Sequence, residues 1–82
     1  MSKEQYMKER MVLYHGIITD VWQKFKKWSA LLPEGNIVWD DLIQDFYSIE
    51  LKYARNHMAV SMCIDALDEL SQLNKELKEM AA

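Results

Sequence analysis

Apolar and aromatic residues recur along the first third of the chain at spacings that alternate between four and three. The members of this seam are Met7, Met11, Tyr14, Ile18, Val21, Phe25, Trp28 and Leu32. Heptad spacing of this kind places an apolar stripe along one face of an α-helix. Ile17, Trp22 and Leu31 widen the stripe, which is typical of a helix that faces a packed bundle. The pattern predicts a helix over residues 2–31.

A turn is predicted over residues 32–39. Pro33 cannot continue the helical hydrogen-bond ladder, and Gly35 supplies the backbone freedom that a turn needs. Asp40 or Asp41 then suits an N-cap, because a carboxylate there accepts hydrogen bonds from free amide groups and interacts favourably with the helix dipole. This is the one clear break in the pattern.

A second heptad seam, interrupted by two asparagines, runs through the rest of the chain. Its members are Leu42, Phe46, Ile49, Tyr53, Asn56, Val60, Cys63, Leu67, Leu70, Asn74 and Leu77. Because no glycine or proline follows Asn36, one continuous helix over residues 40–79 is the simplest interpretation. A break near Arg55 to His57 would give three helices instead.

These elements predict a single all-α domain over residues 1–82, built as an antiparallel helical hairpin of two long, coiled-coil-like helices. The alternative is a three-helix bundle, if the second helix breaks. A hairpin leaves one face open, and the segment 69–82 would have no partner on the first helix. We therefore expect a homodimer or higher homo-oligomer that completes a helical bundle.

Several apolar residues are candidates for contact with a protein partner. Tryptophans are enriched at binding hot spots. Leucines exposed on the segment 69–82, which has no intrachain partner in the hairpin, would favour binding of another chain. Closure of the bundle tip is the alternative role for the tryptophans. The candidate partner-binding residues are Trp22, Trp39, Leu70, Leu73 and Leu77.

The net charge and the single cysteine limit the partners and the cellular compartment that suit the chain. The 82 residues carry a formal net charge of −3, which argues against a nucleic-acid partner, since such proteins normally gather a basic surplus on one face. The lone Cys63 cannot form an intrachain disulfide, and the chain shows neither a signal-peptide pattern nor a run of ~20 apolar residues. We expect a cytoplasmic protein without a membrane partner.

A cluster of lysines precedes the predicted turn, and a cluster of aspartates follows it. Cations are favoured near the C-terminus of a helix, and a hairpin would bring the two clusters together. We expect ion pairs between Lys24, Lys26 and Lys27 on one side and Asp40, Asp41 and Asp45 on the other.

Polar residues also meet at mid-hairpin, where Gly16 costs about 1 kcal/mol relative to alanine within a helix. That cost would be explained by close approach of another backbone or of a ligand. The candidate ligand-binding residues, suited to an anionic small molecule, are Tyr14, His15, Tyr53, Arg55, Asn56 and His57. The alternative is a polar layer in which Asn56 fixes helix register.

Enzymatic motifs are not found in the sequence. His15 and His57 lack the spacing of a metal site, Cys63 has apolar neighbours, and no glycine-rich phosphate loop occurs. We expect no enzyme activity, metal or cofactor; a small helical enzyme using the polar cluster is the weakest alternative.

The predicted function is a small helical protein–protein interaction module of the adaptor or inhibitor type. Short, glycine-poor helical chains without catalytic motifs are common among accessory proteins of phages and mobile elements, and this chain has that general character. The alternative function is binding or sequestering of a small anionic ligand by the polar cluster. The two functions require different structural features. A ligand site requires a polar cavity, whereas an interaction module requires exposed apolar surface.

Overall fold

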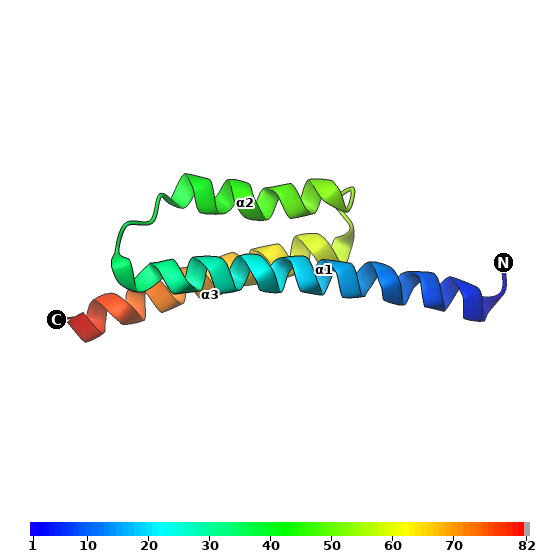
Figure 1. The fold of residues 1–82 in the computed structure, drawn as a ribbon, viewed down its shortest axis with the longest axis horizontal. Helices are drawn as coiled ribbons and strands as arrows, with labels where there is room; N and C mark the ends of the chain where they lie inside the picture. Colours follow the sequence, from blue (N-terminus) through cyan, green and yellow to red (C-terminus); the bar gives the residue numbers. More distant parts are fainter. Residues whose placement is uncertain (82) are drawn as a thin grey trace.

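Three α-helices and a short 3₁₀ turn make up the fold (Figure 1). The computed structural model describes residues 1–81: α1 spans Lys3–Leu31, η1 spans Leu32–Glu34, α2 spans Trp39–Lys52 and α3 spans His57–Ala81. α2 runs antiparallel to α1, and α3 turns back again, so that α1 and α3 run side by side in the same direction. The molecule is elongated, with extents of 58 × 20 × 16 Å.

The predicted two-helix hairpin is wrong, and the three-helix alternative is confirmed. α2 ends in a Schellman motif, in which the Arg55 N–H donates to the Glu50 carbonyl at 2.7 Å and the Ala54 N–H donates to the Leu51 carbonyl at 3.1 Å. Ala54 and Arg55 have φ values of 52° and 56°. Left-handed backbone costs a non-glycine residue about 1–2 kcal/mol, so tertiary packing must stabilise this turn.

α3 begins with a side-chain cap. The Asn56 Oδ1 atom accepts a hydrogen bond from the Met58 N–H at 2.9 Å, and asparagine is among the best N-cap residues because its side chain replaces a missing helical acceptor. Asn56, which interrupts the predicted heptad seam, therefore serves to start a new helix.

The turn allows α3 to cover the groove between α1 and α2. Its buried positions lie one residue before two of the predicted seam positions, so that Ala59 and Ala66 are buried in place of Val60 and Leu67. Small side chains at these points let the helix backbones approach closely. The buried core consists of Ile17, Val21, Trp28, Leu32, Leu42, Phe46, Ile49, Ala59, Cys63, Ala66 and Leu70.

The seam predicted on α1 is buried only in its second half. Trp28 and Leu32 lie in the core, whereas Met7, Met11 and Ile18 are about half exposed. A strict heptad drifts about 20° per repeat around an ideal α-helix, so the two halves of the seam point in different directions. The side that faces α2 and α3 is set by the second half.

The longer projecting segment lies at the other end of the chain from the one predicted, although the last turn of α3 also extends past the end of α1 (Figure 1). The expectation of an unpartnered 69–82 is wrong within the described residues, because Leu70 is fully buried and Leu73 and Leu77 pack against the core; residue 82 lies outside the described residues. Instead the first turns of α1 extend past the loop between α2 and α3 (Figure 1). From Lys3 to Val12 every residue except Arg10 is exposed, a projection of about 15 Å.

No helix within residues 1–81 combines the length and the apolar character that crossing a bilayer requires.

Candidate interaction surface

Four large apolar side chains form a stripe on the outer surface of α1. Met7, Met11, Ile18 and Trp22 are 52%, 51%, 46% and 54% exposed. Their spacings of four, seven and four residues place them within about 60° of one another around the helix. We call these four residues the α1 stripe. Two of them lie on the projecting segment and two lie over the bundle.

The position of the α1 stripe follows from the contacts of its neighbours. α2 contacts the side of α1 that carries Asp20, Lys24 and Lys27. The stripe lies across the buried positions from that side, and therefore beside α3. The indole of Trp22 stacks on Phe25 with ring centroids 6.3 Å apart. A flat aromatic surface thus continues the stripe towards the bundle.

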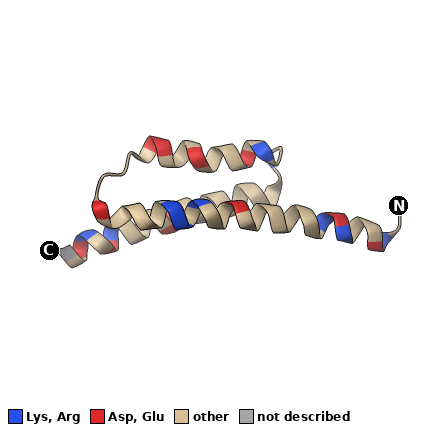
Figure 2. Ribbon diagram, viewed as in Figure 1, with Lys and Arg blue, Asp and Glu red and all other residues tan. Residues whose placement is uncertain are grey.

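Charge is distributed unevenly among the helices (Figure 2). α1 carries six basic and three acidic residues, α2 one basic and four acidic, and α3 two basic and five acidic. Lys8, His15 and Lys26 follow the outer edge of the stripe, with the Lys26 ammonium 5.9 Å from the centre of the Trp22 ring. Glu4 lies on the same side one turn before Lys8. The stripe is therefore apolar with charged residues along its outer edge.

The predicted lysine–aspartate pairing is found at Asp45. Its carboxylate accepts hydrogen bonds from Lys27 Nζ at 3.0 Å and from the Trp28 indole N–H at 2.9 Å, and Lys24 Nζ lies 3.0 Å away. Burial raises the Asp45 pKa, but hydrogen bonds from Lys24, Lys27 and Trp28 outweigh it, so that the pKa lies below its usual value. Asp45 joins α2 to the buried end of α1.

The lowered pKa predicts acid sensitivity. The stability contributed by ionised Asp45 is present above its unfolded pKa of about 3.9 and is lost as the pH falls through the lower folded value. We expect Asp45→Asn to cost about 1 kcal/mol at pH 7 and to flatten the decline of stability below about pH 4. Urea unfolding from pH 7 to pH 2 measures both effects. An unchanged acid limb would contradict this role; Asp65→Asn, an exposed site on α3, is the control.

A second carboxylate ties the other end of α2 to α1. Asp20 accepts hydrogen bonds from Lys52 Nζ at 2.7 Å and from the Tyr53 hydroxyl at 2.6 Å. These bonds lower the Asp20 pKa and raise that of Tyr53, because both favour the ionised aspartate beside a neutral phenol. Gly16 lies one turn before Asp20, and a Cβ there would be 2.9 Å from the Tyr53 oxygen. The close approach at Gly16 is thus made by the Tyr53 side chain, and not by the backbone or ligand that was predicted.

This geometry predicts that replacing Gly16 with alanine has the opposite effect on stability from the usual one. Alanine in place of a helical glycine ordinarily stabilises by about 1 kcal/mol, but here the new methyl group would displace the Tyr53 hydroxyl from Asp20. We expect Gly16→Ala to destabilise the protein by about 1 kcal/mol, because a hydrogen bond to a charged group is lost. In a Tyr53→Phe background the same change should stabilise, since ring carbons 3.7 Å away leave room for the methyl group. Urea unfolding of the four variants measures the cycle; equal effects in both backgrounds would contradict the prediction.

The other predicted ligand-binding residues are distributed over several sites. The Tyr14 hydroxyl accepts a hydrogen bond from Arg10 at 3.0 Å, and Arg55 donates to the Tyr47 hydroxyl at 2.7 Å. His15 and His57 are exposed, and Asn56 caps α3. Of the six predicted residues, the structure brings Tyr53 against the middle of α1. Tyr14, Arg55 and Asn56 serve local contacts.

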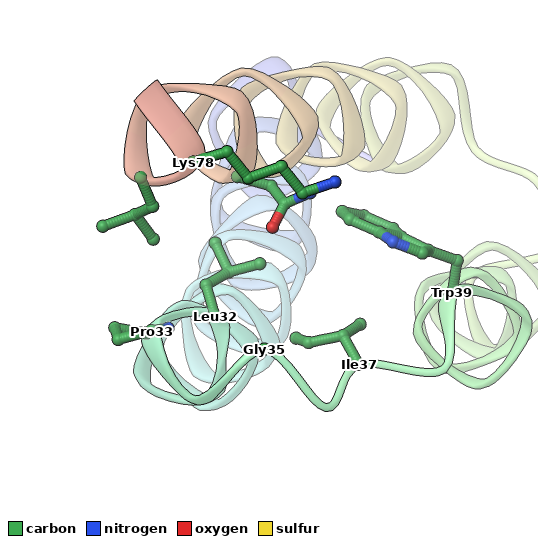
Figure 3. A pocket seen from close by; sticks show the side chains of 8 residues that line it. Leu32, Pro33, Gly35, Ile37, Trp39 and Lys78 are labelled. Carbon is green, nitrogen blue, oxygen red and sulfur yellow. The ribbon is translucent and has the colours of Figure 1, made fainter. Parts of the chain in front are cut away.

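The predicted partner-binding residues also separate. Leu70 is fully buried, Trp22 belongs to the α1 stripe, and Trp39 is half-buried at the start of α2. Near Trp39 a cavity of about 220 Å³ opens between η1, the following loop and the end of α3; its lining residues are Leu32, Pro33, Gly35, Ile37, Trp39, Asn74, Leu77 and Lys78. In Figure 3 the side chain of Lys78 extends across this cavity towards the Trp39 ring.

The single thiol is engaged inside the core. Cys63 is fully buried and its Sγ donates to the Phe46 carbonyl at 3.5 Å. Burial raises the pKa of this thiol to about 11, so that it is protonated at neutral pH and is a poor nucleophile. Among the residues that the structure describes, His, Cys, Asp and Glu side chains do not gather in groups of three that would hold a metal ion.

No family model, curated protein sequence or solved structure matches the chain. The candidate surface therefore rests on the geometry described above.

The heptad pattern predicted that most of the α1 stripe is buried in the core. Met7, Met11 and Ile18 belong to the predicted buried seam, and Trp22 is the one member of the α1 stripe among the predicted partner contacts. For Met7 and Met11 the drift of a strict heptad is the signal that was missed, because each lies three repeats before a buried position, Trp28 or Leu32, and is rotated out of the core.

Proposed function

We propose that the protein is a helical protein–protein interaction module of the adaptor or inhibitor type, and that its binding surface is the α1 stripe. The exposure of Met7, Met11, Ile18 and Trp22 in one line carries the proposal. A binding partner would remove this apolar surface from water, which is the main driving force of association.

The composition of the stripe suits recognition of another helix. Amphipathic helices dock on apolar surfaces through anchors that share one helical face, and the spacing of i, i+4, i+11 and i+15 also places its residues on one face. Tryptophan is enriched among residues that dominate binding energies, and methionine adapts its shape to a partner. The polar side chains on the bundle side of α1, including Asp20 and Lys24, already hold α2. Over the bundle, Ile18 and Trp22 stay about half exposed on the opposite side of α1.

Site-specific photo-crosslinking tests the proposal. A photoreactive amino acid is introduced at Ile18 or Trp22, with Gln44, an exposed polar residue on α2, as the matched control. Irradiation of cells that produce the protein should give a discrete product of higher mass from positions 18 and 22 and much less from position 44. Products no more abundant at 18 and 22 than at 44 would contradict the proposal.

A further inference from the structure

We propose that the partner covering the α1 stripe is a second copy of the chain, paired antiparallel with the first along α1. This inference rests on the proposed function and names its partner. It follows from three features of the stripe: the symmetry of its spacing, its division between the projection and the bundle, and the charges at its ends.

The spacing of the α1 stripe is the same in both directions. Read from either end, the intervals are four, seven and four residues. Turning a second copy end for end therefore places Met7 opposite Trp22 of that copy, and Met11 opposite Ile18. A twofold axis would pass between Tyr14 and His15. Such self-complementarity is what an isologous dimer interface requires.

The same pairing covers the exposed halves of the stripe in both copies. Met7 and Met11 lie on the segment that projects beyond α2 and α3, whereas Ile18 and Trp22 lie over the bundle. In the antiparallel dimer the projection of each copy lies on the bundle of the other. Both halves of the stripe are then covered, and the interface is closed.

Charges at the two ends of the stripe match in this orientation. Glu4 lies beyond Met7 and Lys26 lies beyond Trp22, so the antiparallel pairing brings Glu4 of one copy beside Lys26 of the other, twice per dimer. Within one copy these residues are about 33 Å apart on a straight helix and cannot meet. A parallel dimer would instead oppose Glu4 to Glu4 and Lys26 to Lys26.

Further along, the projection meets the acidic α3 of the second copy. The helical repeat places Asp65 and Glu69 on the flank of α3 that borders the stripe, and both are exposed. Lys3, one position before Glu4, would lie beside this flank. The basic α1 of one copy and the acidic α3 of the other are thus complementary.

The area of the stripe indicates weak pairing. Four large apolar side chains that are each about half exposed amount to roughly 400 Å² per copy. Twice that area, with the charged edge added, is near the lower limit of specific interfaces, where weak and reversible association is usual. We expect a monomer–dimer equilibrium with a Kd on the order of micromolar.

A charge exchange tests the orientation. Sedimentation equilibrium of the full chain should show that Glu4→Lys and Lys26→Glu each weaken dimerisation about tenfold, because each replaces two attractive contacts with repulsive ones. The double variant E4K/K26E should recover to within about threefold of the starting Kd. Glu79→Lys, an exposed site at the far end of α3, is the control and should leave the Kd unchanged. Circular dichroism confirms that the variants fold. Failure of the double variant to recover would overturn the antiparallel pairing.

Thiol crosslinking tests the register independently. Met11→Cys and Ile18→Cys chains, one of them tagged, are mixed and treated with a short bifunctional thiol reagent; the buried Cys63 does not compete. The antiparallel dimer predicts a mixed product of Met11→Cys with Ile18→Cys and little product from either variant alone. Products formed mainly by each variant with itself indicate a parallel pairing and would overturn the inference.

The failure of this inference is distinguishable from the failure of the proposed function. A protein that stays monomeric at several hundred micromolar, yet crosslinks through position 18 to a different protein in cells, would leave the proposed function standing and overturn the second copy as partner. A monomer without crosslinks at the stripe would overturn both. A crosslinked product of twice the monomer mass, together with recovery in the double variant, supports both.

Discussion

Replacing Phe46 with alanine is expected to lower the free energy of unfolding by about 3–5 kcal/mol, because it leaves a large cavity in a small core. Phe46 is the largest of the fully buried side chains. It lies in the middle of α2, and its carbonyl accepts the Cys63 thiol hydrogen bond that links α2 to α3. Since domains of this size are stable by only about 5–10 kcal/mol, the variant should be close to unfolding at 25 °C.

Urea unfolding followed by circular dichroism measures this loss. Ile43→Ala on the same helix is the matched control, since Ile43 is 47% exposed and its truncation should cost less than about 1 kcal/mol. If the Phe46 variant fails to fold, Phe46→Leu, which removes less volume, should still cost more than the Ile43 control. Equal losses at positions 43 and 46 would contradict the burial of Phe46.

Enlarging Ala59 to leucine is the second large effect and is specific to the three-helix architecture. Ala59 is fully buried near the start of α3, where its methyl group allows close approach of the neighbouring helices. Leucine there would force α3 outwards, at a cost of about 3 kcal/mol. In a two-helix hairpin with the predicted seam through Val60 and Cys63, position 59 would lie beside the core, and the substitution would be nearly neutral.

Ala30→Leu is the matched control for this change, because Ala30 is exposed on α1. It makes the same substitution within a helix and should shift the free energy of unfolding by less than about 0.5 kcal/mol. Thermal and urea unfolding of both variants separate the cases. A loss at position 59 no larger than at position 30 would contradict the packing of α3 into the groove.

Two surface features could be predicted, because they depend only on local chemistry and on the reversal of the chain after α1. The pairing of the lysines near the end of α1 with Asp45 required only that the chain reverse at Pro33. The energetic cost of glycine in a helix indicated a close contact at Gly16, although its partner is the Tyr53 side chain and not the predicted backbone or ligand. The α1 stripe could not be recognised as a whole in advance, because Met7, Met11 and Ile18 belong to the same heptad pattern as the buried Val21, Trp28 and Leu32. Which of them are buried depends on where α2 and α3 lie.

By itself the sequence determined the all-helical class, the extent of α1 and the reversal after it. These features depend on the heptad spacing and on Pro33 and Gly35, whose effects act within a few residues of their position. Gly35 adopts the left-handed conformation that the turn needs, with a φ of 76°. Only the tertiary structure decided that the second predicted helix breaks. Ala54 and Arg55 both favour helix, and nothing local forces them into left-handed backbone. Burying Ala59, Cys63 and Leu70 against α1 and α2 removes far more apolar surface from water than a free hairpin face could, and this gain outweighs the strain of the turn.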